Sequence, residues 1–190
     1  MWLLFFWFIK QYYNFAQLFI NYYMRKIFPY ISFLVLIIIF IIFIRLIYPI
    51  KYRDLIVKYS VEYDIAPEII SALINTESSF NKDAVSDAGA KGLMQVLPST
   101  ADEIGQKLDK TDYNLSDPNT NIQFGCYYLR YLLDYYSNDY IYALCAYNAG
   151  INNVKHWNFN GDIETIPVKQ TKNYVKKIVK SIQVYKAFYY

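Results

Sequence analysis

The stretch IISALINTESSF, residues 69–80, decides the fold of this chain. Its apolar residues Ile70, Leu73 and Ile74 have the spacing of one face of a helix. The next position on that face is occupied by Glu77, where the pattern calls for another apolar residue. We therefore expect a helix that buries one side and carries a carboxyl group on that buried side.

The position of Glu77 predicts a raised pKa. Burial disfavours a charged carboxylate, and the nearest basic residue in sequence, Lys82, lies more than a helical turn away. The helix signals fade after Phe80, so Glu77 also lies near the C-terminal end of the helix, where the helix dipole disfavours an anion. A carboxyl group that keeps its proton near neutral pH suits a general acid. The alternative is a structural glutamate that caps the helix or pairs with a residue distant in sequence.

Composition favours one domain with its own core and argues against a nucleic-acid partner. The chain has 190 residues, of which 55% are hydrophobic. Residues 1–50 contain four basic residues and no acidic residue, whereas the rest of the chain contains 15 basic and 16 acidic residues. The positive net charge therefore belongs to the N-terminal segment, and residues 51–190 lack the charge expected of a nucleic-acid-binding surface.

The cysteines and the single histidine do not predict a metal site. Cys126 and Cys145 belong to no Cys-x-x-Cys pair, and His156 stands alone. Both cysteines lie in apolar helical patterns, so we expect buried free thiols, with a disulfide outside the cytoplasm as the alternative. No cofactor is expected.

The N-terminal 50 residues predict one membrane-spanning helix. We divide them into an apolar and basic segment, residues 1–26, and a transmembrane signal-anchor, residues 27–50, whose core from 31 to 44 is uninterrupted and apolar. Arg25 and Lys26 precede this run without any acid, which predicts a cytoplasmic N-terminus and a single-pass protein in the cell membrane, with residues 51–190 outside the cytoplasm. No small-x-small cleavage pattern follows, so we expect an uncleaved anchor. Residues 1–23 are either an extra membrane-surface segment or sequence upstream of a natural start at Met24.

Residues 51–190 are expected to form one mainly helical domain. Polar loops are expected at residues 81–89, 109–119 and 150–161, and no strand alternation or internal repeat is present. Helical patterns cover residues 52–63, 66–80, 98–105, 120–136, 140–148 and 168–185.

Several short motifs stand out in this domain, namely Glu77-Ser78, Gly92-Leu-Met-Gln95, Asp117-Pro-Asn-Thr-Asn-Ile122 with Gly125, Ala146-Tyr-Asn-Ala-Gly150, and Ile166-Pro167 leading to Tyr174-Val175. Together they resemble one family, the soluble-type (SLT) lytic transglycosylases, in the family's order and over nearly all of residues 51–190. The resemblance implies a goose-lysozyme-like helical fold. Each motif is common when taken singly, and the specificity lies in their combination.

The resemblance implies roles for the first part of the site. Glu77 would be the single catalytic acid and base. Ser78 would form a hydrogen bond near the reacting sugar. Gln95, with Met94 beside it, would line the cleft and contact the glycan.

It also implies roles for later residues. Tyr147 and Asn148 would shape the site and bind the N-acetyl group of the sugar, and Tyr174 would reach towards Glu77 or the substrate. One position departs from the family, which often has an acidic residue before Thr171, where this chain has Gln170. The departure leaves the electrostatic tuning of Glu77 open.

The resemblance implies peptidoglycan glycan strands as the substrate and a lytic, non-hydrolytic cleavage between N-acetylmuramic acid and N-acetylglucosamine. Asp83 and Asp87 lie in a polar loop and are expected to be solvated, so one carboxyl group would perform both proton transfers. The alternatives are a hydrolytic muramidase on the same fold and a non-catalytic peptidoglycan-binding scaffold. No protein partner is predicted.

Overall fold

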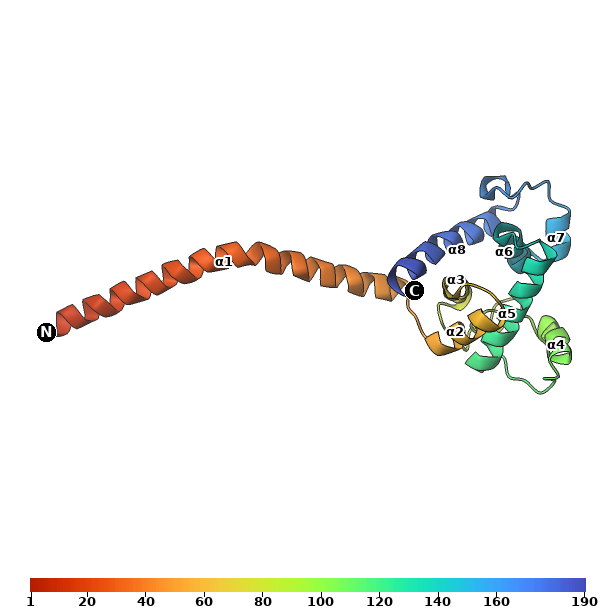
Figure 1. The fold of residues 1–190 in the computed structure, drawn as a ribbon, viewed down its shortest axis with the longest axis horizontal. Helices are drawn as coiled ribbons and strands as arrows, with labels where there is room; N and C mark the ends of the chain where they lie inside the picture. The colour runs from red at the N-terminus through yellow and green to blue at the C-terminus, as the bar shows by residue number, and fades with distance from the viewer. The chain divides into compact units, whose positions relative to one another are not determined.

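A computed structural model describes residues 1–190 as two compact units, Met1–Ile47 and Tyr48–Tyr190. Figure 1 follows the chain from end to end. Regular structure is entirely helical, and the extended backbone is limited to two isolated bridges, Val85 with Lys91 and Lys91 with Val96. The prediction of a mainly α protein is confirmed.

The first unit is a single helix, α1 (Trp2–Ile47), with no buried residue. By length and composition it is the one helix of the chain that could cross a membrane. The predicted division at residue 26 falls inside this helix, and Pro29 does not interrupt it.

The second unit contains the remaining helices. A short 3₁₀ helix, η1 (Ile163–Thr165), precedes the last α-helix. The α-helices are α2 (Arg53–Glu62), α3 (Pro67–Ser78), α4 (Pro98–Lys107), α5 (Pro118–Tyr135), α6 (Tyr140–Ala149), α7 (Ile151–Lys155) and α8 (Lys169–Phe188).

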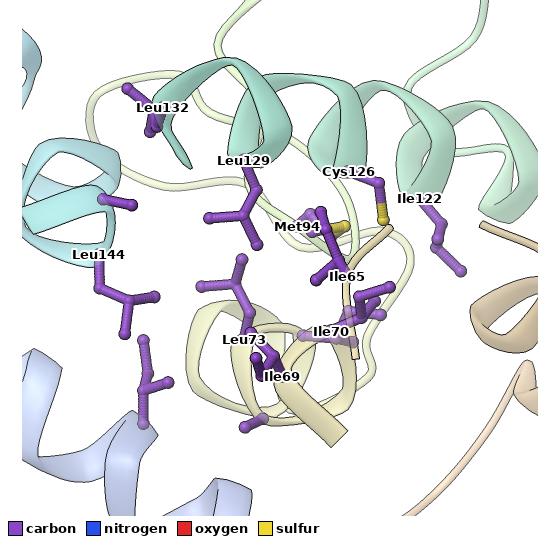
Figure 2. Packing of buried hydrophobic residues seen from close by; sticks show 14 of the residues in the cluster. Ile65, Ile69, Ile70, Leu73, Met94, Ile122, Cys126, Leu129, Leu132 and Leu144 are labelled. Carbon is purple, nitrogen blue, oxygen red and sulfur yellow. The ribbon is translucent and has the colours of Figure 1, made fainter. Parts of the chain in front are cut away.

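Helix α3 lies at the centre of this unit. It packs along α8 on one side and against α2, while α5 packs on α2, α4 and α6. Figure 2 shows Leu73 of α3 facing Leu129 of α5, with Met94 beside them. These three side chains are fully buried, and burying each contributes about 1.5–3 kcal/mol. The apolar stripe of residues 69–80 therefore organises the core, as the sequence predicts.

The second unit begins at Tyr48, before the boundary expected at residue 51. The hydroxyl of Tyr185 donates a hydrogen bond to the carbonyl of Pro49 at 2.7 Å, and the hydroxyl of Tyr189 donates to the carbonyl of Tyr48 at 2.6 Å. The rings of Tyr48 and Tyr185 also meet edge to face, with centroids 5.9 Å apart. The end of α8 and the residue that follows it, Tyr189, therefore hold the start of the unit in place.

Two helices differ from the sequence expectations. Helix α7 lies within the loop expected at residues 150–161, because five residues are too few to show a helical period. Helix α4 continues past Gly105, which is buried where a Cβ atom would lie 2.7 Å from the carbonyl oxygen of Lys110. Gly105 is thus explained by close packing and does not end the helix. Cys126 and Cys145 are buried free thiols, as predicted.

Candidate active site

Helix α3 ends at Ser78, one residue after Glu77, because Ser79 and Phe80 leave the helical conformation. Ser79 and Phe80 have φ values of 51° and 61°, in the left-handed region. The N–H of Ser79 donates to the carbonyl of Asn75 at 3.1 Å, which closes the last turn. Phe80 is 1% exposed, and its buried ring holds this unfavourable backbone conformation. Glu77 therefore lies in the final turn of α3, where the sequence places it.

The carboxyl group of Glu77 has one direct side-chain partner. Its Oε1 atom accepts a hydrogen bond of 2.5 Å from the hydroxyl of Tyr174. Burial raises the pKa of Glu77 from 4.5 to about 7, and the Tyr174 hydrogen bond and the positive charge of Lys177 act against this rise. Burial is the larger effect, so Glu77 holds its proton close to neutral pH.

Helix α8 brings Tyr174 and Lys177 to Glu77. The buried residues Val175 and Ile178 pack this helix along α3, which places Tyr174 at the edge of the contact. Burial and the nearby Glu77 carboxylate raise the pKa of Tyr174 well above its ordinary value. Tyr174 therefore remains a hydrogen-bond donor throughout the physiological range.

The backbone turn at residues 92–95 is held by a buried asparagine. The side-chain amide of Asn121 donates to the carbonyls of Lys91 and Leu115, each at 2.9 Å, and its Oδ1 accepts from the N–H of Met94 at 2.7 Å. Gly92 has a φ of +78°, and a Cβ atom there would lie 2.2 Å from Nδ2 of Asn121 and 2.3 Å from the Leu115 carbonyl oxygen. Only glycine fits this position, which explains its place in the Gly92–Gln95 motif.

Ser78 and Gln95 connect this turn to its surroundings. The hydroxyl of Ser78 donates to the carbonyl of Leu93 at 2.8 Å, which ties the end of α3 to the turn. The side-chain amide of Gln95 donates to the carbonyls of Gly92, at 2.9 Å, and Ala84, at 3.1 Å. The amide oxygen of Gln95 makes no side-chain hydrogen bond, so it can accept one from a ligand.

Met94 does not fit the glycan contact expected from the sequence. Its side chain is fully buried, and a Cβ atom on Gly125 would lie 2.4 Å from its sulfur. The close approach of α5 at Gly125 leaves space for the thioether inside the core. Met94 instead contributes through its backbone, because its carbonyl accepts a 2.7 Å hydrogen bond from the hydroxyl of Tyr147.

Helix α6 supplies Tyr147 and Asn148. Besides its bond to the turn, Tyr147 has its ring centroid 5.3 Å from that of Tyr128 on α5. Oδ1 of Asn148 accepts a hydrogen bond from the hydroxyl of Thr171 at 2.9 Å, which links α6 to the first turn of α8. Asn148 is exposed, and its amide nitrogen makes no hydrogen bond within the protein.

The structure brings the predicted residues into one constellation. Tyr174 touches Glu77 directly, Ser78 joins the end of α3 to the turn that carries Gln95, and Tyr147 binds the same turn from α6. Asp83 lies elsewhere and forms an exposed ion pair with Lys82 at 2.8 Å.

Three other polar residues considered in the sequence analysis lie on the surface. Asp87, His156 and Gln170 are exposed, and the ring of His156 contacts the carbonyl of Asn152 in the preceding helix α7. No second carboxylate is among the groups that act on the pKa of Glu77. The residue Gln170, at the position of the family's acid, makes no side-chain hydrogen bond.

Sequence reasoning missed three contributors. Lys177 acts on Glu77 from 100 positions away in the sequence, so no local pattern could reveal it. Tyr128 was hidden among the many tyrosines, although it follows the apolar period of α5. Asn121 lies in the quoted Asp117–Ile122 motif, but its burial and its hydrogen bonds to the turn are visible only in the structure.

The carboxyl group of Glu77 can donate a proton to one atom of a substrate and then accept a proton from a second atom. A carboxyl group with a pKa of about 7 is nearly balanced between acid and base at neutral pH. The donor Tyr174 stabilises its ionised form, and Gln95 and Asn148 offer one acceptor and one donor to a ligand. These are the parts of an acid-base site that has a single carboxyl group.

Comparisons with known proteins agree with this geometry. A family model described as the transglycosylase SLT domain matches residues 54–165. The soluble lytic murein transglycosylase of Salmonella typhimurium is 34% identical over an alignment of 153 residues, and the match covers 74% of this chain and 24% of that protein. A membrane-bound lytic murein transglycosylase C of Haemophilus ducreyi is 32% identical over 166 residues, covering 71% of this chain and 45% of that protein.

Solved structures are similar as well. The 70 kDa soluble lytic transglycosylase of Escherichia coli superposes with a TM-score of 0.69 at 33% identity, over 74% of this chain and 25% of that one. An inactive mutant of lytic transglycosylase Slt from Pseudomonas aeruginosa gives a TM-score of 0.69 at 30% identity, over 74% of this chain and 24% of that one. This chain therefore matches about a quarter of the length of these soluble relatives. Since the family model covers more than half of the chain, the chain belongs to the transglycosylase SLT domain family.

Proposed function

We propose that this chain is a membrane-anchored lytic transglycosylase that cleaves the β-1,4 bond between N-acetylmuramic acid and N-acetylglucosamine in peptidoglycan. The observation that carries the proposal is the state of Glu77, a lone, partly buried carboxyl group with a pKa of about 7 and a hydrogen bond from Tyr174. The names of the relatives support the substrate class, since they are lytic murein transglycosylases.

In the first step, protonated Glu77 donates its proton to the glycosidic oxygen. The bond from C1 of N-acetylmuramic acid to that oxygen breaks, and N-acetylglucosamine leaves with a free hydroxyl group. The N-acetyl group of the muramic acid stabilises the positive charge that develops at C1. Glu77 is left as a carboxylate, which the hydroxyl of Tyr174 and the charge of Lys177 stabilise.

In the second step, the Glu77 carboxylate takes the proton from the 6-hydroxyl group of the same muramic acid. The oxygen of this hydroxyl bonds to C1 and closes a 1,6-anhydro ring. Glu77 regains its proton, so no water and no cofactor are consumed. One carboxyl group with a pKa near neutral pH is sufficient, because the acid of the first step is the base of the second.

The substrate contacts follow from the groups that remain unpaired. The amide oxygen of Gln95 accepts a hydrogen bond from a sugar hydroxyl, and the amide nitrogen of Asn148 donates to the N-acetyl carbonyl. Ser78 and Tyr147 hold the turn at residues 92–95 and accept further bonds from the sugar through their hydroxyl oxygens. Met94 sets the position of Tyr147 through its carbonyl group.

For location, we propose that α1 crosses the cell membrane once and leaves the catalytic unit outside the cytoplasm. The apolar composition of α1 and the basic residues Arg25 and Lys26 support this topology. A reporter enzyme that works only outside the cytoplasm, fused after Tyr190, is expected to be active. Activity only of a cytoplasm-dependent reporter at the same position contradicts the topology.

The chemistry is tested by digesting purified peptidoglycan in water enriched with heavy oxygen. Lytic cleavage gives 1,6-anhydro muropeptides without label, because the ring oxygen comes from the sugar. A hydrolytic muramidase gives reducing ends that carry the label and one added water. A non-catalytic scaffold gives no new products, so mass spectrometry of one digest separates all three readings.

A further inference from the structure

No flexible linker separates the apolar helix α1 from the second unit. Helix α1 ends at Ile47, and the next residue, Tyr48, already belongs to the compact second unit. The side chains of Tyr48, Ile50 and Tyr52 are partly buried and pack against the hydrophobic core of that unit. The second unit is therefore held by its own packing from the first residue after α1.

Two tyrosines from the end of the chain fix these first residues. The hydroxyl of Tyr185 donates to the carbonyl of Pro49 at 2.7 Å, and the hydroxyl of Tyr189 donates to the carbonyl of Tyr48 at 2.6 Å. Tyr185 is fully buried, and a hydrogen bond that is shielded from water is stronger than an exposed one. We call these two bonds the tyrosine clamp. The clamp prevents residues 48–52, which have no helical structure, from detaching to form a linker.

Helix α8 sets the distance from the clamp to the candidate active site. Tyr174, whose hydroxyl binds Glu77, precedes Tyr185 by about three helical turns, or about 17 Å. A separation of about three turns also places both side chains on one face of α8. Pro49 is the second residue after the end of α1, and two residues span at most about 7 Å. The carboxyl group of Glu77 therefore lies within roughly 30 Å of the end of α1.

This short connection limits where the carboxyl group can act. The second unit can turn about its connection to α1, but turning does not lengthen the connection. A flexible Gly/Ser segment of about 40 residues, in contrast, would add about 35 Å of average reach. Because the chain has no such segment between α1 and Tyr48, the distance of roughly 30 Å is the full reach of Glu77 from the membrane surface.

We propose that the tyrosine clamp restricts cleavage to glycan within about 30 Å of the membrane surface, and that the preferred substrate is a glycan strand attached to the membrane by a lipid. The inference rests on the proposed function for the membrane topology and for the identity of the glycan. A strand with one end in the bilayer always has sugars within this reach, whereas a detached peptidoglycan layer has them only where it rests on the membrane. The reaction that supplies the substrate is therefore one that builds or attaches glycan strands at the membrane surface.

The first test measures the distance from the site to the bilayer, with the full chain in liposomes. Asn173→Cys places a thiol on an exposed position next to Tyr174, and the native Cys126 and Cys145 are buried, so a donor dye labels the new thiol. Energy transfer to dye-labelled lipid headgroups is expected to report a separation below about 30 Å, after correction for the length of the dye linker.

A matched pair of variants changes the reach without changing the site. One carries a Gly/Ser segment of about 40 residues between Ile47 and Tyr48, and the other carries the same segment after Tyr190. The first is expected to lower the energy transfer, and the second is expected to leave it unchanged. In detergent, both variants are expected to cleave soluble peptidoglycan fragments at the wild-type rate, which also shows that they are folded.

The second test measures cleavage by liposomes that carry a polymer brush. The brush is thicker than the reach of the wild-type protein and thinner than that of the variant extended before Tyr48, so it holds peptidoglycan sheets between the two. Wild-type protein is expected to lose most of its cleavage of sheets when the brush is present, and to keep its rate on strands attached to a lipid of the same bilayer. The variant extended before Tyr48 is expected to recover cleavage of sheets, and the variant extended after Tyr190 is not.

The proposal is overturned if energy transfer places the dye beyond the expected limit, or if the brush leaves cleavage of sheets by the wild-type protein unchanged. It is also overturned if the wild-type protein cleaves soluble fragments but not lipid-attached strands, or if the active variant extended before Tyr48 does not recover cleavage of sheets. The proposed function fails by a different result, the absence of anhydro products in the heavy-oxygen digest. The distance measurement does not depend on activity, so it tests the reach in either case.

Discussion

The hydroxyl of Tyr174 donates a 2.5 Å hydrogen bond to Oε1 of Glu77, although 97 positions separate the two residues in the sequence. The bond exists because α8 packs along α3, so helix packing determines the geometry of the acid. The bond favours the ionised carboxylate, yet burial acts more strongly and leaves the pKa at about 7. Tyr174 therefore limits a rise that would otherwise make Glu77 a poor base.

Removal of this hydrogen bond is expected to move the pH profile of cleavage. In the proposed mechanism cleavage needs protonated Glu77, so the rate is expected to fall as pH rises through its pKa of about 7. Tyr174→Phe removes a donor that stabilises the carboxylate, so the pKa rises and the falling limb moves to higher pH. The maximum rate is expected to fall as well, because the carboxylate of the second step is less stable.

Initial rates of muropeptide release across a pH series measure this shift. Tyr185→Phe is the control, since it also removes a tyrosine hydroxyl from α8, and that hydroxyl binds Pro49 and not Glu77. The control is expected to lower stability without moving the limb. A Tyr174→Phe limb that stays in place or moves to lower pH contradicts the role given to this hydroxyl.

The raised pKa of Glu77 also predicts how stability depends on pH. The folded pKa of about 7 exceeds the ordinary value of 4.5, so between these pH values the folded chain binds more protons than the unfolded chain. The contribution of Glu77 to stability is therefore fully present below about pH 4.5 and is lost as pH rises through about 7. This loss is on the order of 3 kcal/mol.

The variant Glu77→Gln removes the titration and keeps an acceptor for Tyr174. We expect it to unfold at the same denaturant concentration as wild type near pH 4, and at a higher concentration near pH 8. Denaturant titrations at both pH values measure the difference. Equal stability of the two proteins at pH 8 would show that the ionised Glu77 carboxylate does not destabilise the folded state.

The turn at residues 92–95 offers a test with an internal control. Gly92 and Gly89 have similar φ values, +78° and +81°, so alanine suffers the same backbone strain at both positions. A Cβ atom at Gly92 meets Asn121 and the Leu115 carbonyl, whereas a Cβ atom at Gly89 meets nothing within 4 Å. Gly92→Ala is thus expected to lose about 2 kcal/mol more stability than Gly89→Ala.

Activity should follow the same order, because the turn carries Gln95 and the carbonyl that binds Tyr147. Gly89→Ala is expected to retain most of the cleavage rate, and Gly92→Ala to lose most of it. Thermal unfolding and muropeptide release measure the two effects. Similar behaviour of the two variants means that the close contact with Asn121 does not position the turn.

The sequence contains enough local information to predict most helices and the acid. The period of Ile70, Leu73 and Ile74 predicts α3, and the interruption of that period by a carboxyl group identifies Glu77. The predicted rise in its pKa agrees with the structure, and burial is the cause that dominates. The helical period and the place of Glu77 within it can be recognised from the local sequence, without knowledge of the tertiary fold.

The remaining features depend on contacts between distant segments. Lys177 reaches Glu77 only because α8 lies along α3, and Met94 enters the core only because Gly125 on α5 leaves room for it. The short α7 carries too few residues for a periodic signal. The packing of helices that are distant in sequence therefore determines these contacts, which the local sequence pattern does not predict.

The central claim is that Glu77 performs both proton transfers, and replacing this one side chain tests it most directly. Wild-type protein and Glu77→Gln, at equal concentration and with matching circular dichroism, are incubated with purified peptidoglycan, and released 1,6-anhydro muropeptides are counted by mass spectrometry. We predict a fall of roughly 100- to 10,000-fold in Glu77→Gln, the contribution of general acid-base catalysis. Release of anhydro products at the wild-type rate by folded Glu77→Gln contradicts the account.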